Sequence, residues 1–306
     1  MHRVATGPIL VVAAAVLWGT TGTAQALGPA GITPETVGAV RMAGGATLAI
    51  YAMVRGETVP VRSLFGPALL AAVVAMAASQ PLFFTGVART GVAVGTIVTI
   101  GTGPILAGLL GWAIRGERVG RRWVIATVLS VCGAILLVSG GAEAGIDITG
   151  VLFALGAGVT WAVYLVSAKE LLDHHPPVFV VAVVFSGAGL LLAPWFFLSH
   201  PGWILSIRGA AVVVWLTMVA TALSYVFFAT GLRTSPIATA ATATLAEPVA
   251  AAVLGMTILG EPLRVTTISG VLLVAVGLLV LSAEQPVEPV ADVDDVPPTL
   301  PERLPQ

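Results

Sequence analysis

The sequence has little charge, and its few charges nearly balance. Only 9% of its 306 residues are Asp, Glu, Lys or Arg, whereas a soluble domain carries about 25%. The chain therefore lacks the charged residues needed to cover a soluble surface. Its 14 basic and 15 acidic residues also lack the excess of positive charge that nucleic-acid binding requires.

Cysteine and catalytic motifs are scarce as well. A single cysteine excludes a disulfide framework and a Cys-ligated metal or iron–sulfur site. The sequence has no GxxxxGK[ST] phosphate loop, which excludes a built-in ATP motor. Its apolar segments hold no His and no pair of Asp or Glu at ligand spacing, so an intramembrane enzyme is disfavoured. We expect no metal and no cofactor.

Long apolar segments dominate what the sequence does contain. The chain is 57% hydrophobic with a mean hydropathy of +1.01, and about 20 apolar residues suffice for a helix to cross a bilayer. The segments are unbroken and lack the alternation of a membrane barrel. We therefore predict an all-α integral membrane protein with ten transmembrane helices. The predicted spans are Gly7–Leu27, Thr33–Val54, Leu64–Val87, Gly91–Ile114, Arg121–Ser139, Ile148–Lys169, Pro177–Leu198, Gly209–Leu232, Pro236–Leu259 and Val265–Ala283.

The basic residues predict the orientation in the membrane. With the N-terminus inside, most Lys and Arg fall on the cytoplasmic side, above all between Arg115 and Arg122. This predicts a multi-pass protein of the cell membrane with both termini cytoplasmic. The first span has an alternative interpretation as a secretory signal peptide cleaved near Ala24–Ala26. The recurrence of Trp18 as Trp161 favours a retained helix.

The chain repeats itself at an offset of about 144 residues. The matches are Phe83–Phe84 with Phe227–Phe228, Arg89–Thr90 with Arg233–Thr234, Pro104 with Pro248, Gly111 with Gly255, Gly116–Glu117 with Gly260–Glu261, and Gly133 with Gly277. Each copy holds five predicted helices, and five is odd, so the second copy enters the membrane from the opposite side. The halves, residues 7–139 and 148–283, are predicted to be inverted repeats, as in many secondary transporters. Residues 284–306 are acidic and rich in proline, which predicts a disordered cytoplasmic tail.

Motifs in both halves resemble those of a known transporter family. They are Leu17–Gly19, Arg41, Pro104 with Gly116–Glu117, and Glu247–Pro248 with Gly260–Glu261. In order, spacing and duplication they resemble the EamA-type family of the drug/metabolite transporter superfamily. The resemblance covers about residues 7–283 and implies two EamA-like repeats that export small metabolites, often amino acids or related compounds, without ATP. The sequence departs from symmetry at Arg41, because the matching position of the second half is Phe185.

Two charged residues lie deep within predicted spans. A charge at the bilayer centre costs about 2.5 kcal/mol or more, and such residues are functional candidates. Arg41 lies about 12 Å and Glu247 about 16 Å from the ends of their helices, in a core about 30 Å thick, so the two side chains can pair. For Arg41 a structural anchor is favoured over a substrate or coupling role. For Glu247 the functional role is favoured, since burial disfavours the charged form of a carboxylate. We hypothesise that Glu247 binds and releases a proton.

Glycine and proline interrupt corresponding spans of the two halves. Gly101, Gly103 and Pro104 match the segment that ends in Glu247 and Pro248. Such paired interruptions are the best sequence indication of a transporter binding site, although glycines also permit close helix packing. We therefore predict helix breaks at Gly101, Gly103, Pro104 and Pro248.

Polar and aromatic residues within other spans are candidates for the wall of a mostly apolar ligand pocket. Together with Arg41 and Glu247, the candidates for substrate binding or coupling are Trp18, Gln80, Thr99, Thr102, Trp161, Tyr164, Ser224 and Tyr225. Each alone is also compatible with packing. We interpret Trp112, Trp123, Trp195 and Trp203, near span ends, as interfacial anchors.

The sequence therefore predicts a secondary active exporter that works by alternating access. Its expected partners are a small-molecule solute, the lipid bilayer and, as a hypothesis, the proton. The alternatives are a polytopic membrane protein that does not transport, such as a receptor or an assembly subunit, and an intramembrane enzyme. The sequence does not determine the oligomeric state.

Overall fold

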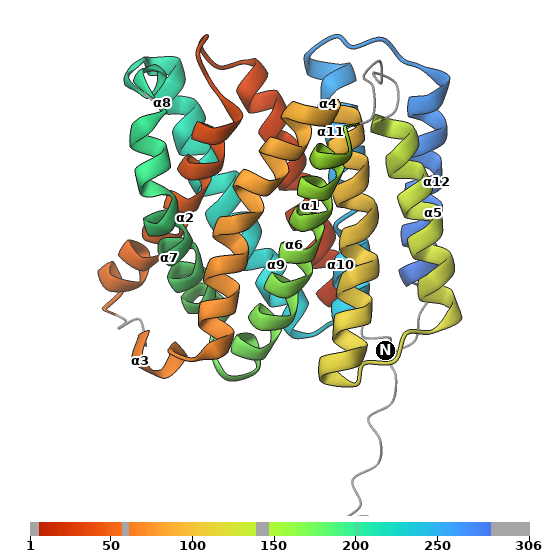
Figure 1. The fold of residues 1–306 in the computed structure, drawn as a ribbon, viewed down its shortest axis with the longest axis horizontal. Coiled ribbons are helices and arrows are strands. Elements are labelled where there is room, and N and C mark those ends of the chain that lie inside the picture. The colour runs from red at the N-terminus through yellow and green to blue at the C-terminus, as the bar shows by residue number, and fades with distance from the viewer. Residues whose placement is uncertain (1–5, 57–60, 139–146, 200, 283–306) are drawn as a thin grey trace, which may run out of the picture.

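The computed structural model describes residues 6–56, 61–138, 147–199 and 201–282. Its elements are α1 (Thr6–Ala26), α2 (Pro34–Val54), α3 (Val61–Leu64), α4 (Pro67–Arg115), α5 (Arg121–Val138), α6 (Ile148–His174), α7 (Pro177–Leu198), η2 (Gly202–Leu205), α8 (Ile207–Val214), the π-helical segment η3 (Trp215–Leu223), α9 (Ser224–Arg233), α10 (Ile237–Ala243), α11 (Ala246–Ile258) and α12 (Val265–Ser282) (Figure 1). The predicted disordered tail lies outside the described residues.

Ten helices of this bundle are long and apolar enough to cross a membrane. The long element α4 supplies two of them, Pro67–Gly91 and Val94–Arg115, because the backbone leaves helical geometry at Gly91 with a φ of 83°. Elements α8, η3 and α9 together form one span, and α10 with α11 forms another. The predicted all-α architecture of ten spans is confirmed.

The two five-span halves are inverted and interleaved. Helix α1 packs against α9 and α11 of the second half, and α6 packs along α4 of the first. Helices α2 and α7 pair, as do α5 and α12 at one edge of the bundle (Figure 1). We call the end of the bundle where α1 begins and α6 ends the closed end. The opposite end, where α1 and α5 end and α12 begins, is the open end.

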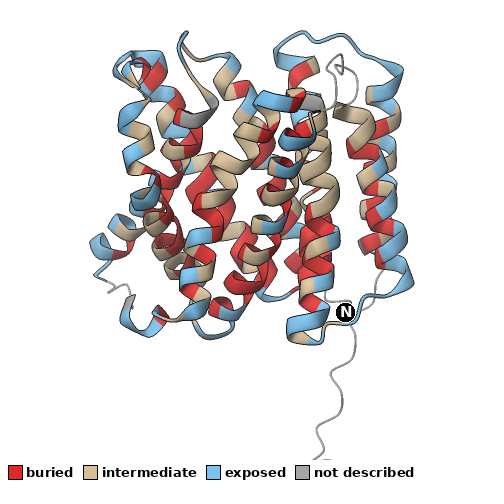
Figure 2. Ribbon diagram, viewed as in Figure 1, coloured by how far each residue is buried: buried red, intermediate tan, exposed pale blue. Residues whose placement is uncertain are grey.

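The distribution of burial is that expected for a bundle in lipid. Many large apolar side chains face outward, including Leu190, Phe197 and Leu279. Figure 2 shows buried residues on the inner faces of the helices and exposed ones around the outside. The interior is rich in alanine, which allows close approach of helices that have no hydrophobic drive to associate within a bilayer.

Helix starts follow ordinary capping rules. The Thr33 hydroxyl accepts from the Thr36 N–H at the start of α2, and an oxygen of Asp147 accepts from the N–H groups of Thr149 and Gly150 at the start of α6. The first N–H groups of a helix have no partner within it, so these side chains satisfy them.

Sequence and structure differ at the predicted helix breaks. Helix α4 continues through Gly101, Gly103 and Pro104, and its non-helical residue is Gly91. In the second half the helix is interrupted at Thr244–Leu245, and Pro248 lies in the first turn of α11. Proline is tolerated in a first turn, where its missing N–H would have no helical partner.

Two of the four tryptophans predicted to be interfacial anchors lie inside the bundle instead. Trp123 and Trp203 are buried, whereas Trp112 is 60% exposed. The indole N–H of Trp203 donates to the Thr36 hydroxyl at 3.2 Å, so this ring links η2 to α2. Proximity to a span end alone does not distinguish a surface tryptophan from one that holds two elements together.

Candidate functional site

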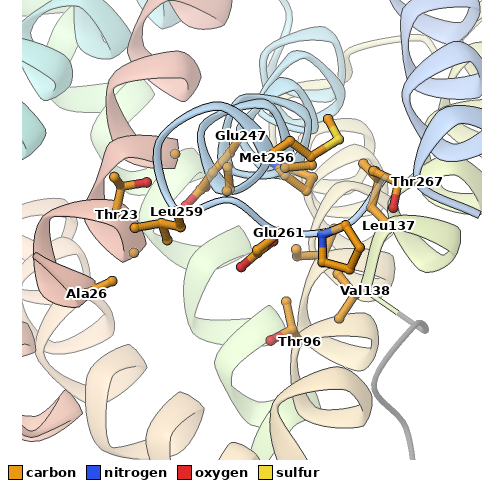
Figure 3. A pocket seen from close by; sticks show the side chains of 18 residues that line it. Thr23, Ala26, Thr96, Leu137, Val138, Glu247, Met256, Leu259, Glu261 and Thr267 are labelled. Atoms are coloured by element: carbon orange, nitrogen blue, oxygen red, sulfur yellow. The ribbon is translucent and has the colours of Figure 1, made fainter. Parts of the chain in front are cut away.

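A cavity of about 530 Å³ enters the bundle at the open end. Its wall is built from the second half of α1, the last turn of α5, the length of α11, the second span of α4, and the turn that leads into α12 together with the first turn of α12 (Figure 3). The polar side chains that line it are Thr23, Thr96, Glu247, Glu261 and Thr267. The described lining contains two carboxylates and no Lys, Arg or His.

Of the two carboxylates, Glu247 lies farther from the open end, because α11 begins next to it and ends before Glu261. It is in the first turn of that helix, directly after the interruption at Thr244–Leu245, and its N–H donates to the Thr244 carbonyl at 3.0 Å. The N-terminus of a helix carries partial positive charge, which favours a carboxylate there. The helix interruption therefore places an acidic group where its charge is tolerated inside the bundle.

Arg41 on α2 is close enough for its charge to interact with that of Glu247. No salt bridge joins the two side chains among the described residues. The Arg41 Nε is buried and has no hydrogen-bond partner in the described part of the chain. The Tyr225 hydroxyl lies within electrostatic reach of both charges. The two predicted intramembrane charges thus lie near one another without forming a direct pair.

Four of the predicted site residues meet in the core as an aromatic cluster, and a fifth, Ser224, is hydrogen-bonded to it. Trp18, Trp161, Tyr164 and Tyr225 contact one another's rings together with Phe185 and Phe228. The Trp18 indole N–H donates to the Ser224 hydroxyl at 2.8 Å. Gly19, which lines the cavity, follows Trp18 in a helix that runs toward the open end. Trp18 therefore lies just to the closed-end side of the cavity, and none of these rings belongs to the cavity lining that the structure describes.

Three other predicted polar residues form hydrogen bonds within the bundle. The Thr99 hydroxyl donates to the carbonyls of Gly95 and Ala154, and the Thr102 hydroxyl donates to that of Val98. The Gln80 amide donates to the Ser79 hydroxyl. Of the ten predicted binding or coupling residues, Glu247 lines the cavity.

Sequence reasoning missed four polar residues of the cavity wall. Thr23, Thr96 and Thr267 carry no pattern that separates them from other threonines in the spans. Glu261 belongs to the repeated Gly–Glu step, but its position after a span end is one that an ordinary loop residue also occupies. The fold is needed to show that this loop reaches over the cavity mouth.

The closed end is held by buried charged groups. The Lys169 ammonium donates to the carbonyls of Leu232, Arg233 and Ser235 at 2.7, 2.9 and 2.9 Å. These carbonyls lie in the last turn of α9 and directly after it, where the helix leaves acceptors without partners and a cation is favoured.

Unlike the bonds of Lys169, which lie within the second half, other contacts at the closed end join the two halves. A Glu117 carboxylate oxygen accepts from the Ile237 N–H at 2.7 Å. Arg115 donates to Asp173 at 2.6 Å and lies 3.8 Å from Glu117. Arg115 and Glu117 belong to the first half, whereas Asp173 and Ile237 belong to the second. These bonds close the end of the bundle opposite the cavity.

An inverted pair of five-helix halves, a cavity open at one end and a sealed opposite end are features of a carrier. Residues 5–139 and 148–283 each match the EamA-like transporter family. The chain belongs to the EamA-like transporter family. It is thus a multi-pass membrane transporter, and family membership indicates transport of a small-molecule solute.

Individual relatives agree with this assignment. The chain is 42% identical over 275 residues to the uncharacterized transporter YwfM of Bacillus subtilis, covering 90% of this chain and 93% of that protein. It is 31% identical over 218 residues to the threonine/homoserine exporter RhtA of Escherichia coli, covering 66% of this chain and 69% of that protein. A solved crystal structure matches 90% of this EamA-family chain with a TM-score of 0.78 at 20% identity, which shows a shared fold.

Proposed function

We propose that this protein is a secondary active exporter of small amino-containing metabolites that works by alternating access in the cell membrane. The observation that carries the proposal is the cavity that ends on Glu247 at one end of the bundle, while Lys169, Arg115 and Glu117 seal the other. With both termini cytoplasmic, the closed end faces the cytoplasm and the cavity faces outward. Inverted halves give the opposite state by an equivalent rearrangement.

The charges near the cavity support a substrate with an amino group. Glu247 and Glu261 line the cavity, and Arg41, whose charge interacts with that of Glu247, has a buried Nε with no partner in the described residues. A zwitterion complements this arrangement, because its ammonium suits the carboxylate and its own carboxylate suits the guanidinium. The printed name of the relative RhtA, a threonine/homoserine exporter, points in the same direction.

Glu247 also supports proton coupling in this proposal. A carboxylate that faces a cavity in an otherwise apolar span can exchange a proton for the substrate ammonium. Protonation on the outer side would then release the amino compound, and loss of the proton on the inner side would allow the next molecule to bind. Such use of an intramembrane acid is common in transporters.

Transport into everted membrane vesicles tests the proposal. Labelled threonine, homoserine and a panel of amines and organic acids would be offered with and without an imposed proton gradient. We expect gradient-dependent accumulation of one or more amino compounds, and no accumulation of acids that lack an amino group. Accumulation of none of the amino compounds, with the protein present in the membrane, would contradict the proposed function.

A further inference from the structure

The repeated Gly–Glu motif has the same backbone conformation at both ends of the bundle. The Glu117 N–H donates to the Gly111 carbonyl at 3.2 Å, and the Glu261 N–H donates to the Gly255 carbonyl at 3.1 Å. The intervening glycines, Gly116 and Gly260, have φ values of 68° and 71°, which favour glycine. The two motifs are therefore structural equivalents at opposite ends.

The carboxylates of these two motifs make different contacts. Glu117 is 19% exposed, accepts from the Ile237 N–H at 2.7 Å and lies 3.8 Å from Arg115. Glu261 is exposed in the cavity wall, and no hydrogen bond or salt bridge of its carboxylate is present among the described residues. One member of the pair is thus bound to the other half, while the other has no such partner in the part of the chain that the structure describes.

The repeat identifies the group that Glu261 would bind. Ile237 begins α10 in the second half, and the residue about 144 positions earlier is Ala93. The backbone there follows the turn at Gly91 and leads into the span Val94–Arg115. The first backbone N–H groups after such a turn have no helical acceptor, and a carboxylate is favoured beside them.

The cavity separates Glu261 from this segment. Thr96 and Ile100, from the start of the same span, line the cavity together with Glu261 (Figure 3). Closing the open end brings these two walls together. The described lining supplies no cation that could bind Glu261 in place of the backbone.

We propose that Glu261 is the positioning residue of the open-end gate. When the cavity closes, its carboxylate accepts from the backbone N–H groups near Ala93, as Glu117 accepts from Ile237 at the closed end. Glu117 leaves Ile237 when the closed end opens. The two glutamates thus stabilise opposite states of one equilibrium. This assignment rests on the alternating access proposed above.

Accessibility of a cysteine in the cavity wall tests the gate directly. The probe is Thr96→Cys in a protein whose only cysteine, Cys132, is replaced by Ala, purified in lipid nanodiscs so that both faces are accessible. The rate of reaction with a hydrophilic maleimide reports the open cavity. The variants are Glu117→Ala, Glu261→Ala and both together, with Glu170→Ala, a neighbouring exposed acid on α6, as the control.

The gate assignment predicts opposite effects from equivalent residues. Glu117→Ala should slow labelling by about threefold or more, because it removes a bond made in the state with the open cavity. Glu261→Ala should not slow it, and adding Glu261→Ala to Glu117→Ala should restore the rate to within about twofold of the background. Glu170→Ala should leave the rate unchanged. Glu117→Gln keeps an acceptor oxygen and should slow labelling less, which provides a milder variant if Glu117→Ala does not fold.

Failure of the gate and failure of the proposed function give different results, because labelling needs no substrate. If the double variant labels as slowly as Glu117→Ala, or if Glu261→Ala alone slows labelling, the assignment of Glu261 is wrong. If labelling changes as expected but no solute is transported, the gate stands and the proposed function fails.

Discussion

The closed and open ends of the bundle are made from repeats of one sequence, but their charged groups are bound in different ways. At the closed end, Lys169 binds three carbonyls and Glu117 binds the backbone of the other half. At the open end, Glu261 faces the cavity. The inter-half ion pair there, Arg89 with Asp147 at 3.4 Å, is 50% and 35% exposed.

The two ends share the repeated Gly–Glu motif, but they differ in the residues around it. Lys169 is matched at the same offset by Gln25, an uncharged residue that donates to the Thr21 carbonyl of its own helix. The open end therefore lacks the ammonium that satisfies carbonyls at the closed end. The two ends thus share the repeated backbone motif and differ in the lysine, which has no charged counterpart at the matching position.

Removing the Lys169 ammonium should have the largest effect on this comparison. Hydrogen bonds to charged groups contribute about 1.5–3 kcal/mol each, and Lys169→Met leaves three carbonyls without their donor. We expect transport to fall about tenfold or more and the melting temperature of the purified protein to drop. Glu170→Gln, next to it and exposed, should change neither. Wild-type transport and melting in Lys169→Met would show that the ammonium does not hold the closed end.

The aromatic cluster between the two ends gives the next largest effect. Trp18→Phe removes the indole donor to Ser224 and part of a buried ring, for a loss of about 1–3 kcal/mol of stability. We expect a lower melting temperature and a cavity that is less well sealed from the closed end. Trp112→Phe is the matched control, because Trp112 is 60% exposed. An equal loss of stability in both variants would argue against a seal at Trp18.

The α5–α12 contact should respond to a single methyl group. A Cβ at Gly133 would lie 2.7 Å from the Gly270 carbonyl oxygen and 2.8 Å from the Val274 nitrogen, so Gly133→Ala should cost about 1–3 kcal/mol. At Gly101 the nearest atom is 3.6 Å away, and Gly101→Ala should be neutral or stabilising by up to about 1 kcal/mol. Thermal unfolding measures both. Lost transport with unchanged stability in Gly101→Ala would instead support a helix break in another state.

The exposed ion pair at the open end should give the smallest effect. Although desolvation opposes ionisation, the Gly150 and Thr149 N–H groups and Arg89 outweigh it and hold the pKa of Asp147 below its ordinary value. Asp147 therefore stabilises the fold above the ordinary aspartate pKa, and this contribution disappears as pH falls through the lowered pKa. Asp147→Asn should lower the melting temperature slightly at neutral pH and not at strongly acidic pH. An equal decrease at both pH values would contradict a role for the charge.

Composition and the repeat were enough to predict the ten spans and their inversion, because apolar length and an odd number of helices per copy determine both. Glu247 could be identified since a carboxylate within a span is rare. The aromatic residues could be singled out as a group, but their packing into one cluster depends on contacts between helices far apart in sequence. The position of Glu261 in the cavity wall could not be predicted from the sequence, because the sequence does not show which loops border a cavity.

Proton-driven transport in Glu247→Gln, compared with Glu261→Gln, tests the central proposal most directly. Both carboxylates face the same cavity, but only Glu247 is proposed to exchange a proton for the substrate. In proteoliposomes, Glu261→Gln should keep transport that depends on the proton gradient, at a changed rate. Glu247→Gln should lose that dependence and the wild-type pH profile. A Glu247→Gln protein whose transport still follows the proton gradient and the wild-type pH profile would contradict the account.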